Sequence, residues 1–486
     1  MDKTRRDNFA IAYFSKISPE ILRSIFEYFC PHCCNEYQWP FGAPPPSKRN
    51  QDNTTLYNLC LVSRYFRPFA QEILHHSFDP SYARCGAPNP WERRLEPFLQ
   101  TIASRPHLAS SVKTVFLKSP LVESLDFDQC RKAFDACART FGRSAEDVYE
   151  KGHATDSSAI KRAFFRGTSP PQYMRSEDFI PTVMGQLLSI LVSILSSLAH
   201  ICIEKNCCWQ FDVSPATLDV LGINSIPLKT LESDLALENL LSRAPELETL
   251  VTSGSGEYPN MPCVRNLHIR SQMAIQASAI SHCLSACTGT LSAFSYTAFD
   301  SDIVGVVNLL HKSRFRASLE SLHLDMRHHN SRGNHKMPSL KEFTQLKRVF
   351  LHTYFLYGTE YSGYCEEISV VKSLLNILPP NITSLQLSEQ IQTPYGAMRE
   401  DLLRLALNVP VDFPKLREIE SDADHVCDKY LETLFKSIGV GLIHQDLPMR
   451  CWIDTVFRIT GAVDWNDLCH GGADMLLPGE LSDEDL

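Results

Sequence analysis

The sequence lacks an excess of positive charge and lacks the motifs of the common catalytic and nucleotide-binding sites. It carries 47 Lys and Arg residues against 56 Asp and Glu residues, a formal net charge of −9 over 486 residues. This balance creates no overall attraction for polyanions, so we expect no nucleic-acid partner. The patterns G-x-x-x-x-G-K-[ST], H-E-x-x-H and G-x-S-x-G do not occur, and Pro259 breaks the dinucleotide-binding fingerprint after Gly254 and Gly256. We therefore expect a protein that is not an enzyme and uses no cofactor.

Long uncharged apolar runs are also scarce. Residues 183–203 (VMGQLLSILVSILSSLAHICI) contain no Asp, Glu, Lys or Arg, but serines and His200 interrupt them. We predict a buried helix followed by a strand there, and no membrane partner. The opening residues MDKTRRDNF lead into no apolar secretory segment, and the 17 cysteines are an odd number. Both observations favour a reducing, intracellular location, cytoplasmic or nuclear.

The first apolar stripe lies within residues 17–29. Its apolar residues recur at steps of three and four, the spacing of one helix face: Ile17, Ile21, Leu22, Ile25, Phe26 and Phe29. Ser18 suits the N-cap, and Pro19 suits the first helical position, where no N–H is needed. Cys30-Pro31 ends the pattern. Because the following residues up to Asn53 are rich in proline and polar side chains, we expect a surface excursion and not a helix over 30–53.

Apolar spacing resumes after the excursion and predicts two more short helices, separated near Ser63. The first contains Leu56, Leu59, Cys60 and Val62, and the second contains Tyr65, Phe66, Phe69, Ile73 and Leu74. Pro68 is tolerable only near a helix start. Three short helices cannot cover this many large apolar residues between them, so some of these side chains should face a partner.

The segments Ile17-Ser-Pro-Glu-Ile-Leu-Arg-Ser-Ile-Phe-Glu-Tyr-Phe29 and Leu56-Tyr-Asn-Leu-Cys-Leu-Val-Ser-Arg-Tyr-Phe-Arg67 resemble the F-box motif, in the divergent form with a long first loop found in filamentous fungi. Phe66 stands where the family often has tryptophan. The resemblance implies docking onto the Skp adaptor of a cullin-RING ubiquitin ligase. Carried over to this chain, the contact or supporting residues would be Pro19, Ile21, Leu22, Ile25, Leu59, Val62 and Phe66. The alternative is that the stripe packs against the rest of the chain.

A six-residue phrase with apolar residues at its first, fourth and sixth positions recurs along the remainder. Complete copies are Val112-Val115-Leu117, Leu198-Ile201-Ile203, Val264-Leu267-Ile269, Leu291-Phe294-Tyr296, Leu319-Leu322-Leu324, Leu346-Val349-Leu351 and Ile382-Leu385-Leu387. Partial copies begin at Leu247 and Leu416, where Thr252 and Ser421 replace the last apolar residue. Each phrase predicts a short strand, and the segments between them, such as the one containing Val304, Val307 and Leu310, predict helices.

From Val264 to Leu346 the phrases start at intervals of 27 to 28 residues, and later intervals reach 34 to 36 residues. This pattern resembles leucine-rich repeats without their usual asparagine, and it implies an α/β solenoid of parallel strands and helices. We predict an N-terminal extension (1–16), an F-box-like helical domain (17–76), a linker and helix (77–107), the repeat domain (108–460) and an acidic tail (461–486). An insertion at about 120–182 should hold an amphipathic helix near Phe127–Phe141 and a mobile polar stretch at 142–171.

Two groups of metal-binding residue types remain. Cys30-Pro-His-Cys-Cys34 could begin a zinc site, but no second cysteine pair accompanies it, so we favour a cysteine cluster that anchors the loop, and we assign no metal. The same absence argues against an intrinsic RING domain. His323, His328, His329 and His335 fit a solvated loop better than a metal site. Cys207, Cys208, Cys283 and Cys287 lie in apolar repeats and should be core residues.

The leading hypothesis is a substrate-recognition adaptor that docks on Skp and holds a target protein with its repeats. A repeat scaffold outside any ubiquitin ligase is the alternative, and an enzyme that uses the Cys and His clusters is a third. An exposed Ile21, Ile25 and Val62 stripe would favour the adaptor, whereas burial of that stripe against the repeats would favour the scaffold.

Overall fold

The computed structural model describes most of the chain between residues 17 and 447. The described residues are 17–30, 32–34, 46–79, 93–117, 121–122, 124–152, 163–165, 179–203, 210–254, 256–271, 275–298, 303–325, 337–357, 374–389, 397–423, 427–445 and 447. The predicted N-terminal extension (1–16) and acidic tail (461–486) lie outside them, as do Cys207 and Cys208.

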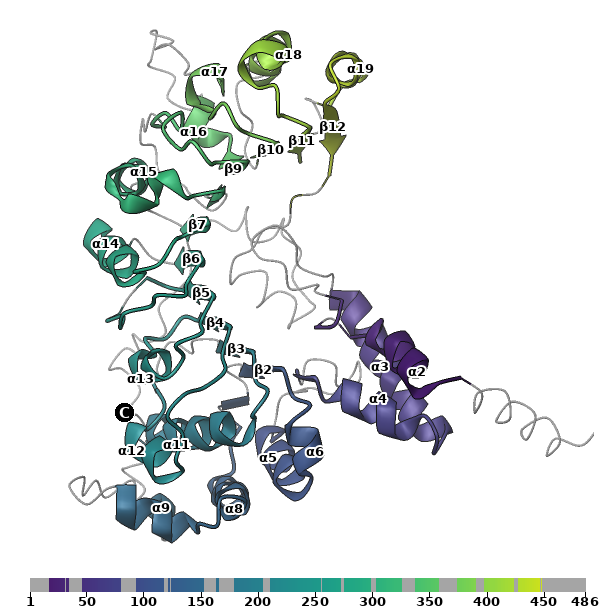
Figure 1. The fold of residues 1–486 in the computed structure, drawn as a ribbon, viewed down its shortest axis with the longest axis vertical. Helices are drawn as coiled ribbons and strands as arrows, with labels where there is room; N and C mark the ends of the chain where they lie inside the picture. Colours follow the sequence, from purple (N-terminus) through teal and green to yellow (C-terminus); the bar gives the residue numbers. More distant parts are fainter. Residues whose placement is uncertain are drawn as a thin grey trace, which may run out of the picture. The chain divides into compact units, whose positions relative to one another are not determined.

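One parallel sheet of twelve strands runs through the described residues, and its strands pair in chain order from β1 to β12 (Figure 1). The strands are β1 (Ser77–Phe78), β2 (Thr114–Leu117), β3 (His200–Ile203), β4 (Thr230–Ser233), β5 (Thr249–Thr252), β6 (Asn266–Ser271), β7 (Ala293–Ala298), β8 (Ser321–Asp325), β9 (Arg348–His352), β10 (Ser384–Ser388), β11 (Glu418–Ser421) and β12 (Gly441–His444). Sequential pairing of parallel strands is the order of a solenoid-like α/β fold, because each strand must return beside its predecessor.

Sixteen α-helices fall within the described part of the chain, most of them between strands. They are α2 (Pro19–Glu27), α3 (Pro46–Val62), α4 (Arg67–Leu74), α5 (Leu95–Ser104), α6 (Pro106–Ala109), α8 (Phe127–Arg139), α9 (Ala145–Gly152), α11 (Phe179–Ile194), α12 (Pro215–Val220), α13 (Glu238–Ser242), α14 (Ala277–Ala286), α15 (Ile303–Lys312), α16 (Tyr354–Tyr357), α17 (Leu374–Ile377), α18 (Ala397–Asp412) and α19 (Lys429–Ser437). A 3₁₀ helix, η3, covers Arg314–Ala317.

The recurring phrase forms a ladder across the sheet, which confirms the predicted α/β architecture of parallel strands and helices. Its fourth position lies in register from strand to strand through Val115, Ile201, Leu231, Leu250, Leu267, Phe294, Leu322, Val349, Leu385, Ile419 and Leu442. The first ten of these side chains are at most 1% exposed. Each repeat of the phrase in the sequence therefore contributes one buried side chain to the same row of the core.

Three strands, β1, β4 and β12, were not predicted by the six-residue phrase. Strand β4 carries only its first two apolar residues, Leu228 and Leu231, before Ser233. Strand β12 has Leu442 in register with Ile419, but its first and last residues are Gly441 and His444, and most of its residues are exposed. Strand β1 has only two residues. In each case pairing with the adjacent strand specifies a conformation that the apolar pattern does not.

The uncharged segment 183–203 forms the predicted helix and strand. Helix α11 is buried along most of its length. Strand β3 follows α11 in the chain and pairs with β2 in the sheet. The serines of α11 satisfy their hydroxyls inside the protein: Ser189 Oγ donates to the Gly185 carbonyl and accepts from the Ser214 N–H. Among the described helices, none is both long and apolar enough to cross a membrane.

The insertion contains more structure than the sequence indicated. Helix α8 confirms the predicted amphipathic helix, but α9 lies within the stretch expected to be mobile, and Phe164 and Phe165 are buried. A capping box begins α9, because Ser144 Oγ accepts from the Asp147 N–H and Asp147 Oδ2 accepts from the Ser144 N–H. The Ser-x-x-Asp pattern at 144–147 marks this helix start, so a helix lies at Ala145–Gly152 where only a polar stretch was expected.

Helices α2, α3 and α4 enclose a small apolar core of their own. It is built from Phe26, Cys30, Leu56, Ala70 and Ile73, and the main core of the sheet forms a separate cluster. Helix α3 begins at Pro46 and not near Leu56, so the expectation of a non-helical segment up to Asn53 was wrong. Pro46 suits the first position of a helix, and the polar residues after it extend α3 backward. We call the described residues of 17–76 the helical unit.

Candidate interaction face of the helical unit

Helix α2 begins as its sequence predicts. Ser18 has extended backbone angles, and its Oγ accepts a hydrogen bond from the Ile21 N–H at 3.4 Å, while Pro19 occupies the first turn. Hydrogen bonds from its own backbone N–H and with Ser18 lower the pKa of the Glu20 carboxyl. A negative charge at this end also complements the helix dipole.

One side of α2 packs inward and fixes the orientation of the helix. Leu22 and Phe26 are 2% and 4% exposed, and the Phe26 ring meets the Phe66 ring edge-on with centroids 5.7 Å apart. Arg23 Nη2 pairs with Glu72 Oε2 on α4 at 2.6 Å. These contacts hold α2 against the junction of α3 and α4, and so they determine which of its residues point away.

The outward side of α2 is apolar. Ile21, Ile25 and Tyr28 are 55%, 46% and 70% exposed, at helical steps of four and three residues. They border a shallow, largely open depression of about 540 Å³, lined by Glu20, Ile21, Ser24, Ile25, Tyr28 and Phe29. Exposed branched and aromatic side chains around a hollow are typical of a surface that receives another protein.

A second exposed stripe follows the end of α3. It comprises Tyr57, Leu61, Val62 and Tyr65, and the Tyr65 hydroxyl donates to the Ile17 carbonyl at 3.3 Å, which joins this stripe to the start of α2. In the described part of the chain, the other large apolar residues with comparable exposure are Leu407, Val411, Tyr430 and Ile443. Exposed apolar side chains are therefore concentrated in the helical unit. We call Ile21, Ile25, Tyr28, Tyr57, Leu61, Val62 and Tyr65 the apolar face.

The seven residues expected to contact or support a partner divide between surface and core. Pro19, Ile21, Ile25 and Val62 are exposed, Leu59 and Phe66 are half-buried against the small core, and Leu22 is buried. Sequence reasoning omitted Tyr28, Tyr57, Leu61 and Tyr65 from this set. Their steps of three and four residues relative to Ile25 and to one another carried the signal.

A cluster of cysteine and histidine side chains lies below the end of α2. Cys30, His32, Cys33 and His76 each place one potential ligand atom within 4.8 Å of all the others. His76 Nδ1 is 3.6 Å from Cys30 Sγ and 3.3 Å from Cys33 Sγ, and His32 Nδ1 is 3.8 Å from Cys33 Sγ. Sequence reasoning missed His76, because more than forty residues separate it from the cysteines and no spacing rule connects them.

The two thiols of the cluster have opposite pKa shifts. A hydrogen bond with Cys33 is the main cause that lowers the pKa of Cys30, while the same hydrogen bond raises the pKa of Cys33. Cys34 lies outside the cluster, and its Sγ donates to the Tyr28 carbonyl at 3.2 Å. The loop is therefore anchored by cysteines as expected, but only two of the three take part in the cluster.

Outside this cluster, the other candidate cysteines and histidines that the structure describes lie inside the repeat sheet and its helices. Cys283 and Cys287 are fully buried, as predicted, and burial raises the pKa of both thiols. His323 was expected in a loop but lies on strand β8. Its Nδ1 is 3.1 Å from Ser295 Oγ on the neighbouring strand β7. Residues 328, 329 and 335 lie outside the described residues, so no histidine cluster is described there.

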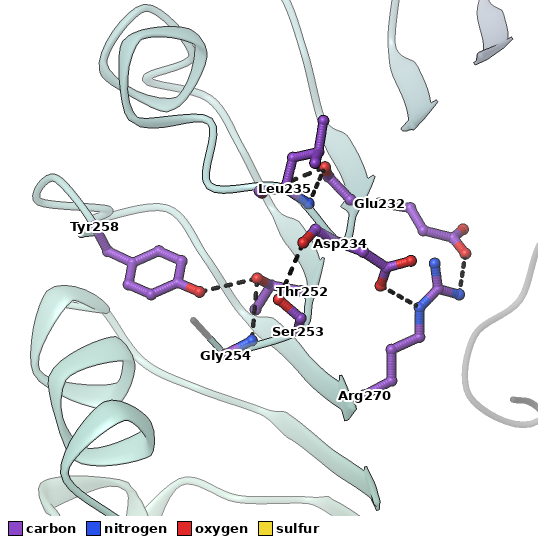
Figure 2. A network of polar contacts seen from close by, with 9 residues as sticks. Glu232, Asp234, Leu235, Thr252, Ser253, Gly254, Tyr258 and Arg270 are labelled. Carbon is purple, nitrogen blue, oxygen red and sulfur yellow. Dashed lines mark hydrogen bonds and ion pairs between the residues drawn. The ribbon is translucent and has the colours of Figure 1, made fainter. Parts of the chain in front are cut away.

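A polar network beside β4, β5 and β6 uses charged residues for cross-linking (Figure 2). Arg270 on β6 pairs with Glu232 on β4 (Nη1–Oε1, 2.5 Å) and with Asp234 (Nε–Oδ1, 3.3 Å). Burial disfavours the charged guanidinium, but the charges of Asp234 and Glu232 outweigh burial and raise the pKa of Arg270. The Thr252 and Tyr258 hydroxyls meet nearby at 2.9 Å. Since both acids neutralise Arg270 within the chain, the network joins β4 to β6 across β5.

Comparison with known proteins adds no assignment. No protein-family model matches the chain, and no curated protein matches it either. The apolar face and the repeats are the features of the described chain that bear on its function.

Proposed function

We propose that the chain is a substrate-recognition adaptor of a Skp–cullin–F-box ubiquitin ligase, in which the helical unit docks on Skp and the leucine-rich-repeat-like sheet binds a target protein. The single observation that supports this most is the exposure of the apolar face. Ile21, Ile25 and Val62 are 55%, 46% and 73% exposed, so they are not consumed by packing against the repeats.

The apolar face has the composition of a protein-binding surface. Seven large side chains, three of them tyrosines, remain outside a core that needs only a few buried residues to hold three helices together. Burying one Ile, Val or Leu side chain contributes about 1.5–3 kcal/mol, so a partner that covers several of them can offset the cost of association. Tyrosine adds a hydroxyl that can hydrogen-bond at the rim.

The repeats supply the second half of an adaptor. A sheet whose strands lie in chain order presents many strand and loop side chains along one continuous surface, as solenoids do when they bind proteins. In this mechanism the chain contributes no catalytic residue. It raises the effective concentration of a target lysine near the conjugating enzyme that carries ubiquitin as a thioester. The transfer of ubiquitin to that lysine, otherwise bimolecular, becomes effectively intramolecular.

The test is co-purification of the full chain with a Skp adaptor. We expect tight binding by the wild type and loss of binding by Ile21→Asp, Val62→Asp. The matched control is Leu407→Asp, Val411→Asp, which places two charges on exposed apolar positions of α18, where the wild-type side chains are 74% and 80% exposed. Circular dichroism of all three proteins checks that they remain folded.

Two results would overturn the adaptor. A folded wild type that does not bind Skp would leave a repeat scaffold outside any ubiquitin ligase. Equal loss of binding in both double variants would mean that the apolar face is not the docking surface. Loss confined to the helical-unit variant supports the proposal, because only the position of the charges distinguishes it from the control.

A further inference from the structure

The Cys and His cluster below α2 has the ligand set of a structural zinc site. Two cysteine sulfurs and two imidazole nitrogens are a common four-ligand set for Zn²⁺. Cys30, His32 and Cys33 come from the loop after α2, and His76 comes from the end of the segment that follows α4. The fourth ligand missing from the sequence pattern is thus supplied by the fold.

The spacing of the ligand atoms matches a tetrahedral ion. Bonds of about 2.3 Å to sulfur and about 2.0–2.1 Å to nitrogen, at tetrahedral angles, place a sulfur and a nitrogen about 3.6 Å apart. Three of the four sulfur–nitrogen pairs between these residues are 3.6, 3.3 and 3.8 Å apart, and all four ligand atoms lie within 4.8 Å of one another. These three distances scatter around the value expected for two ligands of one tetrahedral Zn²⁺ ion.

Neighbouring residues of the same types are turned away from the cluster. Cys34 directs its thiol to the carbonyl oxygens of Glu27 and Tyr28, and His75 Nδ1 lies 2.7 Å from the Gln71 carbonyl oxygen. At both segments, therefore, the chain separates one ligand from an adjacent non-ligand of the same chemistry. This selection also provides matched controls.

We propose that Cys30, His32, Cys33 and His76 bind one Zn²⁺ ion that fastens the end of α2 to the start of the sheet. Cys30 is 2% exposed and belongs to the small apolar core. His76 lies directly before β1, and its carbonyl oxygen accepts hydrogen bonds from the Lys113 and Thr114 N–H groups at 2.8 and 2.9 Å. Because all four ligands come from the protein and no position stays open, the ion is structural and not catalytic.

The first experiment measures metal in the full-length chain, purified without chelators, by elemental analysis. We expect about one zinc per chain in the wild type, and at least a fivefold lower content in Cys33→Ser and His76→Asn. The adjacent controls Cys34→Ser and His75→Asn should retain the wild-type content. Wild-type protein that stays metal-free after incubation with Zn²⁺ would overturn the site, as would equal loss in the controls.

A second measurement covers variants that fail to fold. Wild-type chain depleted of zinc and loaded with Co²⁺ should show the visible absorption of tetrahedral cobalt bound to thiolates, with a sulfur-to-metal charge-transfer band. Cys34→Ser should give the same spectrum. An octahedral cobalt spectrum would overturn the assignment, and so would a Cys30–Cys33 disulfide in the freshly purified wild type, because that bond consumes both thiolates.

Discussion

The helical unit and the repeat sheet treat their apolar residues in opposite ways. In the sheet, the ladder from Val115 to Ile419 is almost completely buried, and each strand covers the apolar residues of its neighbours. In the helical unit, a small core around Phe26 and Leu56 coexists with the exposed apolar face. The difference teaches that apolar periodicity alone does not distinguish a buried core from an exposed apolar surface. The number of neighbouring elements available to cover it decides between them.

The largest effect should come from the centre of the ladder. Leu322 is fully buried, with Phe294 and Val349 in register on either side. Leu322→Ala should lower the free energy of unfolding by about 2–5 kcal/mol, because it leaves a cavity inside the stack. Denaturant titration measures this loss of unfolding free energy. The control is Leu407→Ala at an exposed position, which should change the free energy of unfolding by about 0.5 kcal/mol or less. Similar losses in both variants would remove the distinction between the ladder and the surface.

A pair of adjacent residues on α2 sharpens the comparison within the helical unit. Leu22→Ala should destabilise the helical unit by about 2–4 kcal/mol, since Leu22 is 2% exposed. Ile21→Ala, at a position that is 55% exposed, should leave stability nearly unchanged and weaken binding to Skp. Amide hydrogen exchange of α2, α3 and α4 measures the first effect, and the binding assay measures the second. Faster exchange in Ile21→Ala would show that the apolar face belongs to the core.

The repeats contain a carboxylate whose burial makes stability depend on pH. Burial raises the pKa of Asp212 from 3.8 to about 6, although its oxygens accept hydrogen bonds from the N–H groups of Val213, Asn239 and Leu240. Between these two values the folded chain binds a proton that the unfolded chain does not. Stability should therefore fall by up to about 3 kcal/mol as the pH rises through this window.

Asp212→Asn isolates that contribution. The variant cannot ionise at this position, so the difference in unfolding free energy between wild type and variant should change between pH 4 and pH 7 and stay constant above it. Unfolding titrations at several pH values measure this difference. A difference that does not vary with pH would show that Asp212 ionises in the folded chain as it does in the unfolded chain.

The smallest effect concerns the ion pair on the surface of the helical unit. Arg23 and Glu72 approach to 2.6 Å, but their side chains are 49% and 35% exposed. A double-mutant cycle with Arg23→Ala and Glu72→Ala should give a coupling of about 0.2–1 kcal/mol that decreases with added salt. A larger, salt-insensitive coupling would mean that the pair is a structural lock between α2 and α4.

The sequence was most informative where apolar side chains recur with the period of an element. Nine of the phrases, including the two partial ones, coincide with strands, and the steps of three and four in 17–29 and 127–141 coincide with α2 and α8. Burial follows from periodicity because every repeat faces the same kind of neighbour. The phrase failed at β4 and β12, where Ser233 and His444 occupy the last apolar position and backbone pairing specifies the strand.

Features that depend on contacts between distant segments could not be predicted in this way. His76 joins Cys30 and Cys33 only after α3 and α4 have folded between them, and the composition of the loop gave no sign of that meeting. The start of α3 at Pro46 and the capping box before α9 are visible in the sequence, but proline and polar residues are also typical of loops, so composition alone predicts loops there. Capping chemistry uses the same residue types to begin a helix.

The chain-ordered pairing of β1 to β12 also has a consequence for how such a protein can change length. Every strand touches only its predecessor and successor, so the duplication or deletion of one strand–helix segment leaves all other pairings intact. A doubly wound sheet offers no such freedom, since removing an inner strand separates partners that are remote in the chain. The length of the sheet can therefore change in whole segments, without any change to the three helices that precede it.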